Sequence, residues 1–262
     1  MRRLLILLAT FCSVLIGTTT IFAKSATVGA PIKTIRFAVE ATYPPFEYID
    51  ASGQIKGFDI DLANALCQQI GATCTFTYQT FNSLITSLNL GKFDAIISAI
   101  GITTDRLKQV DFTNSYYEPR ACFVTTLDKP YTLADIVGKK IGVQQATTME
   151  KYINEKYAGK VTVKSYASIQ EAFLDLISGR VDFILTDLPI AQAWLKKDKH
   201  DKRYRIMGEP IIDSVYFGTG YGIAVRKDNT ELLNALNKAL IAIKSNGTYN
   251  KIAKKYFGDY SR

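Results

Sequence analysis

The chain has 262 residues, a hydrophobic content of 47%, a charged content of 21% and a formal net charge of +8. These values are typical of a globular protein with a large core, and they exclude a disordered chain. The basic side chains are dispersed, many of them in solvated runs such as 196–203, and do not form one face with interleaved aromatic side chains. We therefore expect no nucleic-acid partner.

Residues 1–23 have the pattern of an export signal. Two arginines precede an apolar run, and Ala23 suits the last position before cleavage. A membrane anchor is the alternative, but polar residues interrupt the run and it is shorter than a good span. Cys12 would suggest a lipoprotein, but the residue before it is too bulky for the usual attachment pattern. We expect a periplasmic protein whose signal peptide is removed, followed by a flexible leader at 24–33.

The expected elements of the first part of the chain come in strand–helix order. They are a strand at 35–39, a hairpin turn near Gly53, a helix at 58–71, a strand at 74–78, a helix at 81–90 and a strand at 93–98. In the first helix, Ile60, Ala63 and Cys67 share one face, and Gly71 suits the left-handed position that ends a helix.

The second part repeats this order after an extended, aromatic segment at 110–126, which we interpret as a crossing between lobes. The expected elements are strands at 140–143, 161–166 and 181–186 with helices at 147–157, 168–178 and 189–197, then a return crossing at 211–220, a strand at 221–225 and helices at 229–245 and 248–256. Ser168 and Glu171 form a capping box.

Two sequence patterns occur twice. Residues 87–99 and 174–187 each contain a helix end, a glycine, a basic residue and a buried strand with an early Asp. Residues 34–43 and 139–148 are each a short apolar strand that enters a polar loop. The repetition predicts an α/β protein with two β-α lobes, and ligands in such sheets lie beyond the carboxyl ends of the strands. A cleft between the lobes would be lined by Glu40, Ser98, Gln144 and Asp187.

We expect lobe 1 to comprise 34–120 and 215–262 and lobe 2 to comprise 121–214, joined by a two-strand hinge. An exported protein meets an oxidising compartment, so we expect a Cys67–Cys74 disulfide and a buried, free Cys122. The spacing of the cysteines and the single His favour neither a metal site nor a Cys–His nucleophile, and we expect no cofactor.

Arg106 and Asp187 are the main candidates for binding chemistry, because each follows a strand end, one in each lobe. A guanidinium can hold a carboxylate in a two-bond fork, and a carboxylate can accept from an ammonium group. The pair therefore suits an α-amino acid, with help from Thr147 and Thr148 at a helix N-terminus. The alternatives are a surface arginine and a helix N-cap.

Three further residues suit the ligand side chain. Glu40 would carry negative charge into the cleft, and Tyr43 and Phe81 could stack on a flat, cationic group. The alternative is a solvated glutamate and two ordinary core aromatics.

Several segments over about residues 33–258 carry a specific resemblance. They include ATYPPFE (41–47), GFDIDLANALC (57–67), FDAIISAIGITTDR (93–106), GVQQATT (142–148), DLISGRVDFILTD (175–187), YFGTGYGIAV (216–225) and GTYNKIAKKYF (247–257). The chain resembles the periplasmic substrate-binding proteins of ABC amino-acid importers, in the group that binds lysine, arginine, ornithine and histidine, and most of all the arginine-binding members. The resemblance implies the type II periplasmic-binding-protein fold.

It also implies residue roles. Arg106 with Thr148 would hold the α-carboxylate, and Asp187 with the backbone near Ser98 would hold the α-ammonium group. The positions of Tyr43 and Phe81 stack on the side chain, the position of Glu40 is acidic in several members, and Cys67 and Cys74 match the family disulfide. Ala99 and Gly101 depart from polar residues common in relatives, and Gln144 stands where others have Leu.

We therefore expect a monomeric binding protein, and not an enzyme, that captures a cationic L-amino acid and delivers it to an inner-membrane ABC permease. Arginine is the favoured ligand, with lysine, ornithine, histidine and glutamine left open. Ligand that bridges both lobes would favour the closed state. A cyclohexadienyl-dehydratase-like enzyme and an amino-acid sensor domain are the alternatives on this fold.

Overall fold

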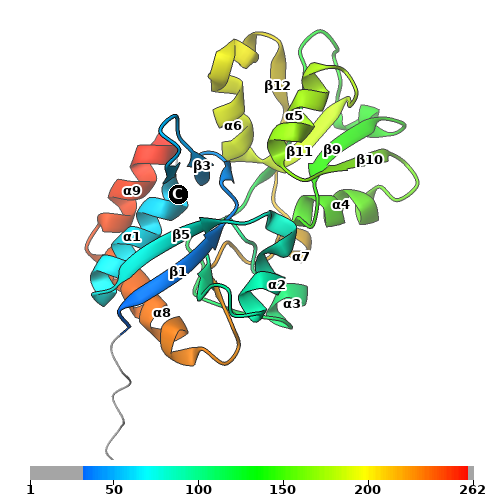
Figure 1. Ribbon diagram of the computed structural model, residues 1–262. Helices are drawn as coiled ribbons and strands as arrows, with labels where there is room; N and C mark the ends of the chain where they lie inside the picture. The colour runs from blue at the N-terminus through cyan, green and yellow to red at the C-terminus, as the bar shows by residue number, and fades with distance from the viewer. Residues whose placement is uncertain (1–31, 259–262) are drawn as a thin grey trace, which may run out of the picture. The chain divides into compact units, whose positions relative to one another are not determined.

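The computed structural model describes residues 32–258, so the expected signal segment and most of the expected leader lie outside the described residues. Each lobe is built on one five-stranded sheet with helices on both faces (Figure 1). Within 32–258 there is no helix with the length and apolar character needed to span a bilayer.

The sheet of lobe 1 has the strand order β5-β1-β6-β13-β7. Its strands are β5 (Thr73–Tyr78), β1 (Thr34–Val39), β6 (Ala95–Ile96), β13 (Ala224–Val225) and β7 (Asp111–Phe112). The first three are parallel, whereas β13 runs antiparallel to both β6 and β7. Strand β13 follows all of the lobe 2 strands in the chain but lies between β6 and β7 in this sheet, which makes lobe 1 discontinuous in sequence.

Helices cover both faces of this sheet because its strands are apolar on both sides. They are α1 (Phe58–Ile70), α2 (Leu84–Asn89), α3 (Thr104–Leu107), α8 (Thr230–Ser245) and α9 (Thr248–Phe257). Phe37 of β1 packs in the cluster that contains Leu62 of α1, whereas the next residue, Ala38, packs with Leu84 of α2. Helix α1 ends at Gly71, whose φ of 81° is the left-handed conformation expected from the sequence.

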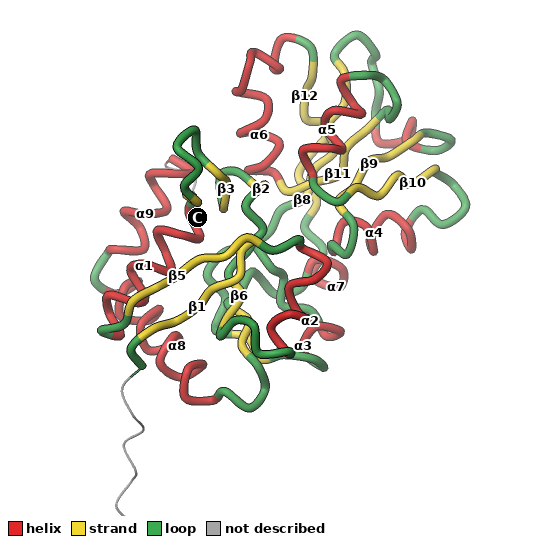
Figure 2. Tube along the Cα trace, in the orientation of Figure 1, coloured by secondary structure: helices red, strands yellow, loops and turns green. Residues whose placement is uncertain are grey.

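The sheet of lobe 2 has the order β10-β9-β11-β8-β12 (Figure 2). Its elements are β8 (Ala121–Thr126), β9 (Lys140–Gln144), α4 (Thr148–Lys156), β10 (Thr162–Tyr166), α5 (Ile169–Ile177), β11 (Phe183–Asp187), α6 (Leu188–Lys196), β12 (Tyr204–Ile211) and α7 (Ser214–Phe217). Strands β9, β10 and β11 are parallel, and β8 is antiparallel to β11 and β12. The carboxyl ends of β9 and β11 therefore meet at one edge.

A short three-stranded sheet follows β1 and shapes the cleft. It consists of β2 (Thr42–Tyr43), β3 (Glu47–Ile49) and β4 (Ile55–Lys56). Gly53 adopts a φ of 76° in the turn between β3 and β4, as the hairpin requires. This sheet fixes Tyr43 and Glu47 close to the end of β1.

The structure differs from the sequence-based expectations at several elements. The helix expected at 81–90 begins as a 3₁₀ turn, η1 (Phe81–Ser83), and the strand expected at 93–98 is limited to β6. Strand β12 was not expected. Its register shifts between Met207 and Ile211, and buried and exposed residues do not alternate along it, so its sequence lacks the usual alternating pattern of a strand. The expected crossing at 211–220 contains α7, because the Asp213 carboxylate accepts from two backbone N–H groups at its start. The segments Leu133–Ile136 and Lys197–Lys202 are further 3₁₀ turns, η2 and η3.

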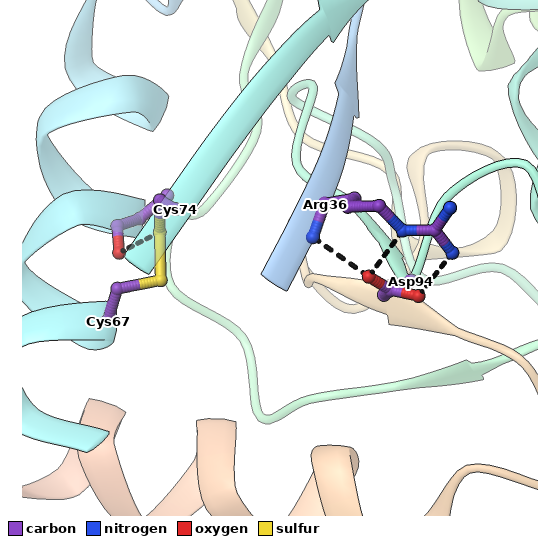
Figure 3. Close-up of a disulfide and its surroundings, with 5 residues drawn as sticks. Arg36, Cys67, Cys74 and Asp94 are labelled. Atoms are coloured by element: carbon purple, nitrogen blue, oxygen red, sulfur yellow. Dashed lines mark hydrogen bonds and ion pairs between the residues drawn. A yellow bond between two sulfur atoms is a disulfide. The ribbon is translucent and has the colours of Figure 1, made fainter. Parts of the chain in front are cut away.

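The Cys67–Cys74 disulfide is present and joins α1 to β5 (Figure 3). Cys122 is a buried, free thiol, as expected. Figure 3 also shows Arg36 of β1, whose side chain pairs with Asp94 at 2.8 Å, before β6. This ion pair is largely exposed, so the covalent link is the stronger constraint on lobe 1.

Reduction of the disulfide is expected to lower the melting temperature. Closing a loop this short contributes roughly 2–3 kcal/mol in the chain-entropy description, which corresponds to a shift of about 5–10 °C for a chain of this size. Differential scanning calorimetry with and without reductant measures the shift. The double variant Cys67→Ser/Cys74→Ser should already show the lower value and should not respond to reductant. A reductant effect of equal size in that variant would contradict the assignment.

Candidate functional site

One cavity lies where strand ends from both lobes meet, and its empty volume is ≈ 330 Å³. All ten residues that the sequence indicated for ligand binding line it: Glu40, Tyr43, Phe81, Ser98, Ala99, Gly101, Arg106, Gln144, Thr148 and Asp187. Four more lining residues are Glu47, Thr147, Met149 and Tyr221.

Arg106 occupies the lobe 1 side of the cavity. It lies in α3, whose start is capped by the Thr103 side chain. Its guanidinium donates from Nη1 to Gly101 O at 3.1 Å and from Nη2 to Ala146 O at 3.2 Å, so it contacts both lobes. No carboxylate within residues 32–258 pairs with it. Burial lowers the pKa of Arg106 to about 10, so the side chain remains cationic at neutral pH. It can therefore still receive an anion.

Asp187 occupies the lobe 2 side, at the end of β11. It is the N-cap residue of α6, but its side chain makes no capping hydrogen bond. Tyr43 Oη donates to Asp187 Oδ2 at 2.6 Å, across the lobes, while Oδ1 is buried without a hydrogen-bond partner in the described chain. Burial raises the pKa of Asp187 to about 6, and the neighbouring hydroxyls of Tyr221 and Tyr43 offset part of that shift. This carboxylate can accept from an ammonium group.

Glu40 follows β1 and is 1% exposed. Its Oε1 accepts from Thr42 Oγ1, and its Oε2 has no hydrogen-bond partner among the residues described. Burial raises the pKa of Glu40 to about 7, and hydrogen bonds from Thr42 and Gln144 act in the opposite direction. A buried carboxyl group with a free oxygen is costly unless a ligand donates to it.

The aromatic residues have different surroundings. The Tyr43 ring stacks on Phe46 with centroids 6.3 Å apart, because its hydroxyl is held by Asp187. The Phe81 ring lies 5.4 Å from the Arg106 guanidinium carbon, a cation–π contact. Whether both rings also contact a ligand side chain, as the sequence indicated, stays a prediction.

Ser98 and Ala99 form the floor of the cavity. Ser98 Oγ accepts from Glu40 N and donates to Glu47 Oε1, both at 2.9 Å. Ala99 has a φ of 42°, unusual for a residue with a side chain, and its N–H donates to Asp59 Oδ2 at 2.8 Å. Two buried acids thus hold the floor in place.

The family model for bacterial extracellular solute-binding proteins, family 3, matches residues 35–259. This chain belongs to the family 3 solute-binding proteins.

Named relatives and solved structures agree with this assignment. The chain is 49% identical over 234 residues to ABC transporter arginine-binding protein 1 of Escherichia coli K12. The aligned region covers 89% of this chain and 95% of the relative. It is 39% identical to the lysine/arginine/ornithine-binding periplasmic protein of the same organism, over 94% of both chains. A Salmonella typhimurium periplasmic binding protein, described as highly specific for arginine, superimposes with a TM-score of 0.81 at 42% identity, over 86% of this chain and 99% of that one.

Gly101 and Gln144, two of the positions where the sequence analysis expected a departure from the family pattern, both lie beside charged side chains of the cavity. A Cβ at Gly101 would lie only 3.0 Å from Phe217 O and in ordinary contact, at 3.5 Å, with Arg106 Nη1, so a larger residue would press on the Phe217 carbonyl beside the guanidinium. Gln144 is buried at the end of β9, where its amide donates to Ala167 O at 3.3 Å and also faces Glu40. Gly101 therefore lies beside the Arg106 guanidinium, and Gln144 lies beside the Glu40 carboxyl group.

The sequence analysis of this solute-binding protein missed the buried polar residues below the cavity. Glu47, Asp59 and Tyr116 are each at most 2% exposed and are linked to the floor residues. Tyr221 was expected only as a strand residue. The local sequence gave no signal for this burial, because acids near a turn or a helix start are ordinarily exposed. Within residues 32–258 no group of His, Cys, Asp or Glu suits a metal ion.

Proposed function

We propose that this solute-binding protein captures a cationic L-amino acid, with arginine favoured, and delivers it to an ABC permease in the inner membrane. One observation carries the proposal: a cationic Arg106 and a carboxylate at Asp187 line the same cavity from different lobes, and a third charged group, Glu40, lies beside them. An amino acid with a basic side chain offers the complementary set of charges.

Arg106 and Asp187 would recognise the part common to all amino acids. Arg106 has guanidinium N–H groups left to form a fork with the α-carboxylate. Thr148, at the first position of α4, would add a donor to the same carboxylate. The unpartnered Asp187 Oδ1 would accept from the α-ammonium group, together with backbone near Ser98.

Glu40, Tyr43 and Phe81 would recognise the side chain. Glu40 Oε2 is an unsatisfied acceptor, so a guanidinium or ammonium group is a better occupant than an amide. Relatives fit this choice, because one is named for arginine and another for lysine, arginine and ornithine. A structural relative at 41% identity is an ancestral arginine-binding protein bound to glutamine. We therefore place glutamine among the weaker candidates.

Ligand capture would couple to closure of the two lobes. Lys151 of α4 and Asp105 of α3 form an ion pair at 2.7 Å across the cleft mouth, and Tyr43 reaches Asp187. Residues 34–120 with 215–262 would move as one body and 121–214 as the other. We also propose export to the periplasm with removal of residues 1–23, and a monomeric state.

A thermal-shift screen against the twenty amino acids, ornithine and citrulline tests the ligand class, and calorimetry gives the affinities. We expect arginine to bind with a Kd on the order of 1 μM or below, equivalent to about −8 kcal/mol. Citrulline, which has the same shape as arginine but no charge, should bind far more weakly. Equal affinities for the two would contradict a charge-selective site.

Acidification is expected to weaken arginine binding. Glu40 and Asp187 have pKa values of about 7 and about 6, raised by burial in the empty cleft. A cationic ligand favours their ionised forms, so binding releases protons and affinity falls as the pH falls through these values. The stability of the protein without ligand changes in the opposite direction. Both folded-state pKa values lie above the ordinary values of the unfolded chain, so the folded state gains stability as the pH falls through them and loses it as the pH rises. Calorimetry between about pH 8 and pH 5.5 should show a loss on the order of tenfold or more, and a flat profile would contradict it.

A further inference from the structure

Two carboxyl groups lie against each other at the cavity floor, one of them in the cavity lining. They belong to Glu47 of β3 and Asp59 of α1, which we call the carboxyl pair; their side chains are 1% and 0% exposed and face one another. No Lys or Arg in the described chain forms an ion pair with either. Two adjacent buried carboxylates without a cation would repel each other strongly.

The donors around Asp59 identify it as the ionised member. Its Oδ2 accepts from Ala99 N at 2.8 Å and from Tyr116 Oη at 3.0 Å. The backbone N–H can only donate, so that oxygen must be an acceptor. Asp59 also lies in the first turn of the 13-residue helix α1, where the helix dipole favours negative charge.

The donors around Glu47 leave one position for a proton. Ser98 Oγ accepts from Glu40 N and therefore directs its own proton to Glu47 Oε1. The remaining oxygens, Glu47 Oε2 and Asp59 Oδ1, are both buried and have no donor among the residues of the described chain. A proton on Glu47 Oε2 would satisfy both of them with a single hydrogen bond.

We propose that the carboxyl pair holds one shared proton, carried on Glu47 Oε2 and donated to Asp59 Oδ1, so that it places a single negative charge below Ser98 and Ala99. Glu47 is then a positioning residue: it fixes the direction of the Ser98 hydroxyl. The charge adds to that of Glu40 in attracting a basic side chain, and this consequence rests on the proposed function.

The groups that face the pair support one retained proton. Besides Glu40, they are the hydroxyl groups of Tyr116 and Tyr249, and none of them is a cation. Burial, followed by the charges of Asp59 and Glu40, raises the pKa of Glu47 well above its usual range. Burial raises the pKa of Asp59 to about 7, and hydrogen bonds from Ala99, Glu47 and Tyr116 restrain that shift. Glu47 is thus the member that keeps the proton.

Infrared spectroscopy of the ligand-free protein tests the proton directly. Wild type at pH 8 should show the C=O stretching band of a protonated carboxyl group, which ionised carboxylates lack. The band should be absent from Glu47→Gln and should persist in the control Glu155→Gln, an exposed residue of α4. A spectrum of wild type without this band, or one that Glu47→Gln leaves unchanged, would overturn the proposal. The result does not depend on which ligand binds.

A double-mutant cycle tests the charge. Glu47→Gln should keep the charge on Asp59, because the amide can accept from Ser98 and donate to Asp59. Asp59→Asn should transfer the charge to Glu47. Each single variant should therefore keep arginine affinity within about twofold to threefold, whereas Glu47→Gln/Asp59→Asn should lose more than the product of the two single effects.

If the loss of arginine affinity in the double variant equals the product of the two single effects, Glu47 and Asp59 each carry their own charge. That result would contradict the shared proton. Melting curves of all three variants establish that each is folded under the assay conditions. Glutamine serves as the neutral ligand for comparison, because its side chain should not respond to the lost charge. If no amino acid binds the wild type, the proposed function fails while the infrared result still decides the proton.

Discussion

Arg106→Ala is expected to abolish binding of every α-amino acid. The partly buried guanidinium lines the cavity, donates to Gly101 O and Ala146 O, and pairs with no carboxylate of the described chain. Its removal would leave the α-carboxylate of the ligand desolvated and unpaired. Truncation of one partner of such a buried pair costs about 2–5 kcal/mol, so calorimetry should show a loss on the order of a hundredfold or more for arginine and glutamine alike.

Two further variants separate this role from a general effect on charge or folding. Arg106→Lys keeps the charge but loses the planar fork, so it should recover only part of the affinity. Lys92→Ala removes an exposed positive charge from the loop before β6 and should bind as the wild type does. Micromolar arginine binding by Arg106→Ala would refute the assigned role.

Glu40→Gln is expected to weaken arginine far more than glutamine. The substitution preserves shape and the hydrogen bond with Thr42, but it removes a buried charge whose Oε2 has no hydrogen-bond partner among the described residues. A charged hydrogen bond contributes about 1.5–3 kcal/mol, compared with about 1 kcal/mol for a neutral one. Arginine affinity should therefore fall about tenfold more than glutamine affinity.

The same variant should also reduce the pH dependence of arginine binding, because Glu40 has the higher pKa of the two acids proposed to contact the ligand, Glu40 and Asp187. Glu155→Gln again serves as the matched control on the surface of α4. Equal losses for arginine and glutamine in Glu40→Gln would remove this residue from side-chain recognition.

Much of the fold was predictable because its strands and helices follow local rules. The apolar run of β1, the amphipathic pattern of α1 and the glycine that ends it specify their own structures. The ten ligand-binding candidates line one cavity because each follows the carboxyl end of a strand or starts a helix there. The two-lobed fold class and the disulfide were likewise confirmed.

The unpredicted parts depend on contacts between distant residues. The edge strand β12 is specified by pairing with β8, 78 or more positions earlier in the chain, and not by its own alternation. The hydrogen bond from Tyr43 to Asp187 spans 144 residues, and the bond from Ala99 to Asp59 spans 40. Burial of Glu47 and Asp59 without a cation could not be deduced from local sequence, since an acid near a turn or a helix start is ordinarily exposed.

A crystal structure of the protein with arginine tests the central claim most directly. We predict that the α-carboxylate will lie in a two-bond fork with Arg106, the α-ammonium group on Asp187, and the guanidinium against Glu40. Electron density for the ligand outside this cavity, or inside it with Arg106 and Asp187 turned away from the zwitterion, would contradict the account.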